Sequence, residues 1–521
     1  MRFHLILIIL INFIFSISIA QKEKPNVILI YADDLGYGDL SCQGATKVQT
    51  PNIDQLAKEG RKFSDAHSAS AVCTPSRYAL LTGEYPIRVN SWGPLPTNNK
   101  LLIDTKNLTV GKLFQNVGYK TACLGKWHLG FGQKEVNQWE VPLGDGPNEV
   151  GFDYYWGVPL VNSNSPFVYV KNKTIVGYDS NDPIKYIGKN SKSGLKPSPT
   201  PTFPKEASIK APNLFTGALE AHKIYDDEKT GTYLVEEATK FITENKKDPF
   251  FLYFATTNIH HPFTPAPRFK GTSQAGLYGD YIHELDWMVG EIVKSLEKNK
   301  LTKNTLIIFT SDNGAMLNLG GRIAMEKGHK INGDLLGFKF GVWEGGHRIP
   351  FIVKWPGKVP AGTESDQLIC SVDMLATFAE ITNQEISLEG KDSKNVLPAF
   401  LGEDVVVRDE LLLAPKQVRN LSLRKGKWMY IPARGSGGFN GSKPGQHACG
   451  GVGAVKFAKS KNSDIENGNY KKDAPKAQLY NLEKDKNQTT NVFKQNPEVV
   501  EEMRKRLAEI KQEVLPRNKS L

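Results

Sequence analysis

The sequence is poor in cysteine and has no long apolar run beyond its first segment. Only five of its 521 residues are cysteine, and their spacings match no zinc-binding pattern. An odd number of cysteines in an oxidising compartment suggests that one thiol serves another role. After Phe15 no stretch is long and apolar enough to cross a bilayer, so we expect no stable membrane insertion. The five are Cys42, Cys73, Cys123, Cys370 and Cys449.

The chain also lacks internal repeats, a compact basic run and any recognisable nucleic-acid motif. Its formal net charge is nevertheless +11, and a positive field favours anionic partners. Nucleic acid is one such partner, but no motif supports it and we expect none. A sulfated polymer fits the positive charge as well as nucleic acid does. Hydrophobic residues make up 40% and charged residues 23% of the chain, which is ordinary for a globular protein.

The amino terminus has the pattern of a secretory signal peptide. Arg2 precedes an apolar run over residues 5–15, and small residues near Ala20 suit cleavage. Gln21 stands where lipid attachment would require a cysteine. We therefore expect a signal peptide over residues 1–20 and an exported chain, either periplasmic or secreted.

Four short apolar runs suit strands that are buried on both faces of a parallel sheet. Helical stretches lie between some of them, and the first follows the capping residue Thr50 and stops near Gly60. Strands alternating with helices imply an α/β fold with a large, mainly parallel central sheet flanked by helices. The expected strands cover residues 26–31, 119–124, 250–255 and 305–310. One expected helix begins at Pro51, and two others cover residues 233–244 and 281–298.

Beyond about residue 402 the sequence pattern changes to short strand-like pieces. We expect one large catalytic domain over residues 21–402 and a smaller C-terminal α+β subdomain over residues 403–521. The subdomain contains strand-like pieces within 420–430 and a final helix over 497–513. Residues 157–230 are irregular and read as long loops over the sheet.

Polar clusters follow directly after all four expected strands. Because open parallel sheets place ligand sites at the carboxyl ends of their strands, these clusters should converge on one site. The clusters are Asp33-Asp34, Lys126 with His128, Asn258 with His260 and His261, and Asp312-Asn313.

The segment Cys73-Thr74-Pro75-Ser76-Arg77 has a reactive setting of its own. Pro75 suits the first turn of a helix, which places residue 73 at a helix amino terminus where backbone N–H groups favour anions. Arg77 lies one turn later and can point at the same place. The alternative is a buried structural cysteine or one half of a disulfide.

This segment, continuing to Thr82-Gly83, resembles the signature of the type I, formylglycine-dependent sulfatases. Gly125-Lys126-Trp127-His128, Glu344-Gly345-Gly346 and Arg348-Ile349-Pro350 also match family motifs in family order. The chain most resembles the arylsulfatase A and N-acetylgalactosamine-6-sulfatase branch of the alkaline phosphatase superfamily. The resemblance implies an alkaline-phosphatase-like sandwich and a sulfuric ester hydrolase acting on a sulfated carbohydrate.

The resemblance implies that a formylglycine-generating maturation enzyme oxidises Cys73 to an aldehyde. One hydroxyl of the aldehyde hydrate would attack sulfur, and the other would lose its proton and expel sulfate. The family's metal ligands correspond to Asp33, Asp34, Asp312 and Asn313, together with an oxygen of residue 73. Such an all-oxygen set suits calcium or magnesium over zinc, and in the family the ion is usually calcium. Taken alone, Asp-Asp and Asp-Asn-Gly are also ordinary turn sequences.

The remaining catalytic roles also come from the resemblance. Lys126 and Lys339 would bind sulfate oxygens, and His128 would be the base that helps the hydrate collapse. The family's His-x-Pro pattern selects His260 as the acid that protonates the leaving alcohol, although His261 could instead line the pocket or pack. Arg322 and His329 lie in a long stretch, Met316 to Lys330, that could contact substrate.

Two other functions remain open from sequence. One is a phosphoesterase or phosphonate hydrolase of the same superfamily, whose members often bind two metals, although no second metal site is apparent in the sequence. The other is a non-catalytic sulfoglycan-binding protein, if Cys73 is never oxidised. The sulfated sugar could belong to an algal polysaccharide such as ulvan or carrageenan, or to a glycosaminoglycan.

Overall fold

The computed structural model describes residues 24–133, 139–187, 215–386, 389–438 and 451–514. The expected signal peptide, Cys449 and part of the irregular 157–230 region lie outside these residues. Within them, no helix combines the length and apolar character that a bilayer crossing requires.

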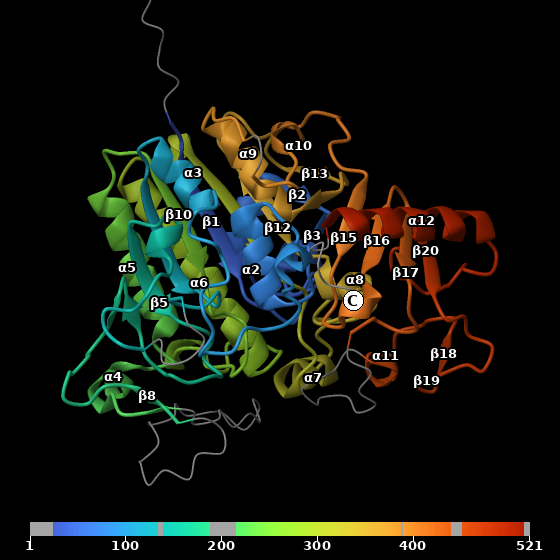
Figure 1. Cartoon of the computed structure of the whole chain (residues 1–521), viewed down its shortest axis with the longest axis horizontal. Helices are drawn as coiled ribbons and strands as arrows, with labels where there is room; N and C mark the ends of the chain where they lie inside the picture. Colours follow the sequence, from blue (N-terminus) through green and yellow to red (C-terminus); the bar gives the residue numbers. More distant parts are fainter. Residues whose placement is uncertain (1–23, 134–138, 188–214, 387–388, 439–450, 515–521) are drawn as a thin grey trace, which may run out of the picture.

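A ten-stranded, mixed and mostly parallel sheet forms the centre of the molecule (Figure 1). Its four central strands run parallel to one another, and all four were expected from sequence. The order across the sheet is β13 (Thr363–Ser365), β2 (Arg61–Phe63), β12 (Phe351–Lys354), β11 (Thr305–Ser311), β1 (Asn26–Ala32), β10 (Phe250–Ala255), β4 (Lys120–Lys126), β5 (Tyr154–Val158), β6 (Val170–Lys171) and β7 (Thr174–Ile175).

Helices cover both faces of this sheet, because β1 is apolar on both sides. Val27, Leu29 and Tyr31 face one core, and Ile28 and Ile30 face the other. The first core includes α2 (Cys73–Thr82), α3 (Val110–Asn116), α9 (Met374–Ile381) and α10 (Leu397–Leu401). The second includes α1 (Pro51–Glu59), α5 (Thr230–Glu244) and α6 (Leu277–Lys298). The three helices expected between the four strands are thus present and cover one face together.

A second, four-stranded antiparallel sheet lies in the C-terminal part of the chain. It has the order β15 (Glu410–Leu413), β16 (Ser422–Lys425), β17 (Trp428–Ile431) and β20 (Gln478–Asn481), and α12 (Pro497–Val514) packs on it. Backbone bonds from Ala414 to Ala69 and from Ala71 to Ala414 join it to the segment before Cys73. This sheet therefore supports the segment that leads into Cys73. The domain boundary at residue 402 stays a prediction.

Short elements complete the fold at the rims of the two sheets. The region between β5 and α5, expected as irregular loops, contains only short elements where it is described, and two of these, β6 and β7, extend the edge of the central sheet. The paired strands are β3 (Ala66–His67) with β14 (Ile369–Cys370), β8 (Lys185–Tyr186) with β9 (Phe215–Thr216), and β18 (Ile465–Glu466) with β19 (Asn469–Tyr470). The short helices are α4 (Leu219–Ile224), α7 (Leu319–Glu326), α8 (Glu344–His347) and α11 (Val452–Phe457).

Candidate active site

The polar clusters that follow the four central strands meet at the carboxyl edge of the sheet. Backbone bonds from Asp33 N to Asn258 O (2.8 Å) and from Asp312 N to Ala32 O (3.1 Å) join three of the strand ends. The fourth joins through Lys126, whose Nζ lies 2.7 Å from Asp33 Oδ2. The structure therefore brings together residues that lie far apart in the sequence.

Cys73 begins helix α2 and lies at this edge. Its sulfur and one carboxylate oxygen each of Asp33 and Asp312 all lie within 4.8 Å of one another. Cys73 forms no disulfide with the other cysteines that the structure describes. Its neighbour Thr74 donates to the carbonyl of His128 (3.0 Å) and accepts from the amide of Leu95 (3.0 Å). The start of the helix is thereby fixed against the loop that follows β4.

Three carboxylates and three cations are buried side by side at the site. Asp33 pairs with Lys126, Asp312 pairs with Arg77 Nη2 (2.8 Å), and Asp34 Oδ1 pairs with Lys339 Nζ (2.5 Å). All six side chains are almost completely excluded from solvent. The formal charges of these six groups cancel, so their mutual pairing offsets much of the cost of burial.

The carboxylates nevertheless perturb one another. Burial, together with Asp312 and Asp34, raises the pKa of Asp33 to about 7 in spite of Lys126. Burial also opposes ionisation of Asp312, but Arg77 and the two lysines outweigh it and lower the pKa of that carboxyl. An additional cation would therefore favour the charged form of Asp33.

Two oxygen atoms at the site are available to a hard cation. Asp34 Oδ2 and Asn313 Oδ1 are buried and have no hydrogen-bond partner among the described residues. Asn313 uses its other atom, Nδ2, to donate to Asp34 Oδ1 (2.7 Å). Unpaired buried oxygens are costly unless a ligand satisfies them. The set Asp33, Asp34, Asp312 and Asn313 therefore fits an oxygen-coordinated divalent ion.

His128 is held with one ring nitrogen free. Its Nε2 lies 3.3 Å from the carbonyl oxygen of Leu95, which can only accept, so Nε2 carries the proton. Nδ1 is buried and has no partner among the described residues. Burial and then Lys126, Arg77 and Lys339 lower the pKa of His128 well below its usual range. The ring is therefore neutral, with a lone pair on Nδ1.

The backbone turns at His128, just beyond the end of β4. Strand β4 ends at Lys126, and His128 has a φ of +58°. Lys126 reaches Asp33, while the His128 ring turns toward the loop that contains Leu95.

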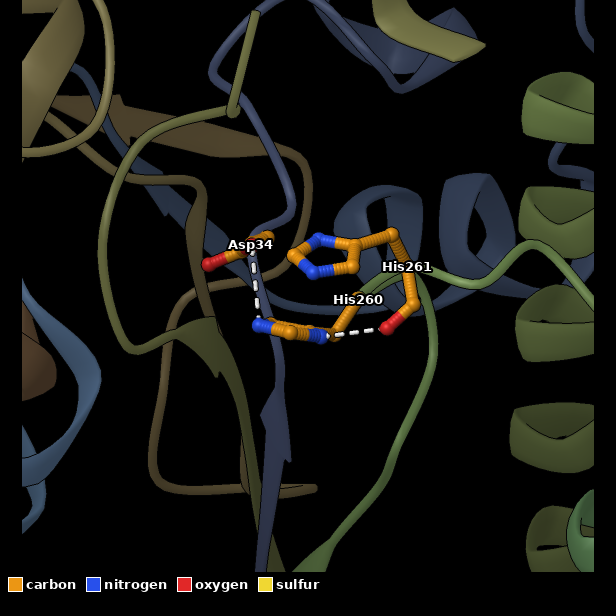
Figure 2. A group of neighbouring side chains, drawn as sticks. All are labelled: Asp34, His260 and His261. Carbon is orange, nitrogen blue, oxygen red and sulfur yellow. Dashed lines mark hydrogen bonds and ion pairs between the residues drawn. The ribbon is translucent and has the colours of Figure 1, made fainter. Parts of the chain in front are cut away.

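His260 and His261 both lie beside Asp34 (Figure 2). His260 Nε2 is 3.7 Å from Asp34 Oδ2, and its Nδ1 is 2.6 Å from the carbonyl oxygen of His261. The two rings are in contact, with centroids 4.1 Å apart. Burial, and then His261 and the two lysines, lower the pKa of His260 well below its usual range.

The long stretch before Lys339 makes contacts that join neighbouring parts of the fold. His329 is buried and bonds Asp39 through Nε2 (2.7 Å), and Arg322 lies 3.6 Å from Glu326. Asn332 accepts from the amide of Ala315 (3.0 Å) and donates to the carbonyl of Gly337 (3.0 Å). It thereby joins the loop after Asn313 to the loop before Lys339, a role that no sequence signal reveals.

The comparisons with known proteins agree with this geometry. The family model described as Sulfatase matches residues 25–384. An N-acetylgalactosamine-6-O-sulfatase of Bacteroides thetaiotaomicron is 37% identical over 508 residues, with 94% of each chain covered.

Solved structures extend the likeness over nearly the whole chain. One, described under the metabolism of multiple glycosaminoglycans by Bacteroides thetaiotaomicron, has a TM-score of 0.81 at 37% identity and covers 94% of this chain and 99% of that one. Another, Ps i-CgsB in complex with κ-ι-κ-neocarrahexaose, has a TM-score of 0.66 at 27% identity and covers 94% and 92%. The family match, the relatives and the alkaline-phosphatase-like fold together show that the chain belongs to the sulfatase family and is a sulfuric ester hydrolase.

Proposed function

We propose that this chain is an exported sulfatase that removes sulfate from sulfated sugars of a polysaccharide, using formylglycine at position 73 and one calcium ion. The observation that carries the proposal is the position of Cys73. It stands at a helix amino terminus, beside Asp33 and Asp312 and within a buried set of three carboxylates and three cations.

The charges at the site suit a sulfate ester and a calcium ion together. Asp33, Asp34, Asp312 and Asn313 would hold the ion, with an oxygen of modified residue 73. When bound, calcium would supply positive charge that polarises the sulfate and favours the ionised form of the nucleophile. Arg77 and the two lysines already balance the three carboxylates, so the added positive charge would attract an anionic substrate. Once the carboxylates serve a cation, Lys126 and Lys339 become available to sulfate oxygens.

The two histidines divide the proton transfers between them. The neutral ring of His128 has its lone pair on Nδ1 and can accept the proton of the hydrate when sulfate is expelled. His260 must carry a proton on Nε2 to donate to the leaving alcohol. The negative charge of a bound sulfate ester favours that proton and opposes the effect of burial.

A sulfated sugar is supported by the relatives and by the charge of the chain. The Bacteroides relative bears the name N-acetylgalactosamine-6-O-sulfatase, and Ps i-CgsB binds a neocarrahexaose. The net charge of +11 favours a polyanionic substrate. Both a glycosaminoglycan and an algal polysaccharide such as carrageenan or ulvan fit these observations, and the signal-peptide pattern supports export.

The direct test is mass spectrometry of the peptide that contains Cys73, from protein co-expressed with a formylglycine-generating enzyme. We expect the aldehyde at position 73 and hydrolysis of an aryl sulfate. Cys73→Ala should reduce turnover by at least about a thousandfold, because it removes the nucleophile. Near-normal turnover by this variant would refute the assignment.

The substrate is tested with defined sulfated oligosaccharides and matched phosphate esters. We expect sulfate release from a sugar, beginning with 6-sulfated N-acetylgalactosamine and carrageenan oligosaccharides. Faster release of phosphate would support a phosphoesterase instead. Binding of sulfated oligosaccharide by aldehyde-bearing protein without any release would support a binding protein.

A further inference from the structure

A second group of metal-ligating side chains lies beside the oxygen-rich site. Ligand atoms of Asp34, His260 and His261 all lie within 4.8 Å of one another, and all three residues are buried. Figure 2 shows both imidazole rings beside the Asp34 carboxylate. This group offers two nitrogens and one oxygen, whereas the neighbouring set offers mainly oxygens.

The hydrogen bonds leave two acceptors facing each other in this group. The carbonyl of His261 can only accept, so His260 Nδ1 carries a proton, and in the neutral ring the lone pair lies on Nε2. Nε2 is directed at Asp34 Oδ2, 3.7 Å away. That oxygen is buried and has no hydrogen-bond partner among the described residues. A cation between the two atoms would satisfy both.

We propose that Asp34, His260 and His261 form a binding site for a transition-metal dication such as Zn²⁺, and that its occupation inhibits hydrolysis. Imidazole nitrogens favour zinc, copper or nickel, while calcium prefers oxygen ligands. The inhibitory half of the proposal rests on the proposed function. No local sequence pattern predicts this second site, because Asp34 and the two histidines are 226 or more positions apart.

Inhibition follows from two residues that the second site shares with the first. Zinc on His260 Nε2 occupies the lone pair that must carry the proton for the leaving alcohol. Asp34 Oδ2, one of the two unpaired oxygens that the calcium site would use, also lies 3.7 Å from His260 Nε2, so the two sites share this carboxylate. Zinc at the second site therefore removes a proton donor and alters a ligand of the calcium site.

Another buried group with similar side chains lacks this capacity. Asp65, His67 and Glu344 also bring three ligand atoms within 4.8 Å. Arg348 contacts both carboxylates, at 2.6 and 2.7 Å, and both nitrogens of His67 have partners. The ligand atoms of this group are therefore already paired with other side chains, unlike Asp34 Oδ2 in the first group.

The binding half is tested on full-length Cys73→Ser protein, in which no thiol or aldehyde is present at position 73. Zinc chloride is titrated by calorimetry in buffer containing millimolar calcium. We expect one tight equivalent of zinc, weakened at least about tenfold by His261→Gln in the same background. His283→Gln is the matched control, because His283 is a half-buried histidine on α6 outside the proposed site, with its ring nitrogens bonded by the amide of Gln49 and the hydroxyl of Thr272. Unchanged zinc binding after His261→Gln would overturn the site.

The inhibitory half is tested on aldehyde-bearing enzyme with an aryl sulfate in excess calcium. We expect zinc to lower kcat/KM at least about tenfold, and a nitrogen-donor chelator that spares calcium to restore it. For His261→Gln, measured against its own zinc-free rate, half-inhibition should require at least about tenfold more zinc. Tight binding without inhibition would overturn this half. Inactivity without zinc would instead count against the proposed function and leave the calorimetric result standing.

Discussion

The molecule contains two buried ionic clusters that use similar side chains in different ways. At the carboxyl edge of the sheet, Asp33, Asp34 and Asp312 face two lysines and Arg77, and oxygens of Asp34 and Asn313 have no partner among the described residues. We call this the catalytic cluster.

The second, the structural cluster, consists of Asp65, His67, Glu344, His347 and Arg348. Arg348 bonds both carboxylates, and the rings of His67 and His347 meet at Nδ1, 2.9 Å apart. A guanidinium satisfies two carboxylates in a fixed geometry, whereas a lysine can leave its partner when another ligand arrives. The comparison shows that unpaired acceptors, more than burial or the number of charges, distinguish a binding site from a structural cluster.

The largest expected effect comes from Asp312→Asn in the catalytic cluster. The amide keeps the size of the side chain but removes one charge that would hold the metal. We expect kcat/KM for an aryl sulfate to fall at least about a thousandfold. Stability should change little, because relief of repulsion from Asp33 and Asp34 offsets the weakened pairing with Arg77. Thermal unfolding serves as the control, and activity within about tenfold of wild type would contradict the assignment of Asp312.

The structural cluster should show the opposite pattern when Glu344 is changed to Gln. Although burial opposes ionisation, Arg348 and His347 hold the pKa of Glu344 at about 2, so the native group is charged. Removing that charge leaves Arg348 partly unpaired in the interior, and we expect a loss of about 3–5 kcal/mol in unfolding free energy. Denaturant unfolding measures this loss. The kcat of the folded fraction should stay within about tenfold of wild type, and a thousandfold fall would erase the distinction between the clusters.

The sequence predicts the catalytic cluster far better than the structural one, for a physical reason. Buried parallel strands have continuous apolar runs, and polar residues at their ends must meet at one edge, so Asp33 and Asp312 could be placed together. His67 and His347 are 280 positions apart and meet only through tertiary packing. For the same reason the sequence does not predict the role of Asn332 or the antiparallel pairing of β12 with β11, since neither leaves a local pattern.

Glu284 sharpens the comparison, because it is a buried carboxylate without an ion pair among the described residues. It accepts from Asn258 Nδ2 (3.0 Å) and from the amide of Ala266 (3.3 Å). Burial raises its pKa from 4.5 to about 7. Between these values the native chain holds a proton that the unfolded chain has lost. The unfolding free energy therefore falls as pH rises from about 4.5 to 7, by up to about 3 kcal/mol.

Glu284→Gln removes this titration while keeping the size of the side chain. We expect the variant to gain stability relative to wild type as pH rises from 5 to 8, by up to about 3 kcal/mol, measured by denaturant unfolding at each pH. Other buried carboxyls titrate equally in both proteins and cancel in the difference. A stability difference that is constant over this pH range would show that Glu284 is already charged at pH 5. A buried carboxylate would then need no cation to stay ionised, and the contrast between the two clusters would lose its electrostatic basis.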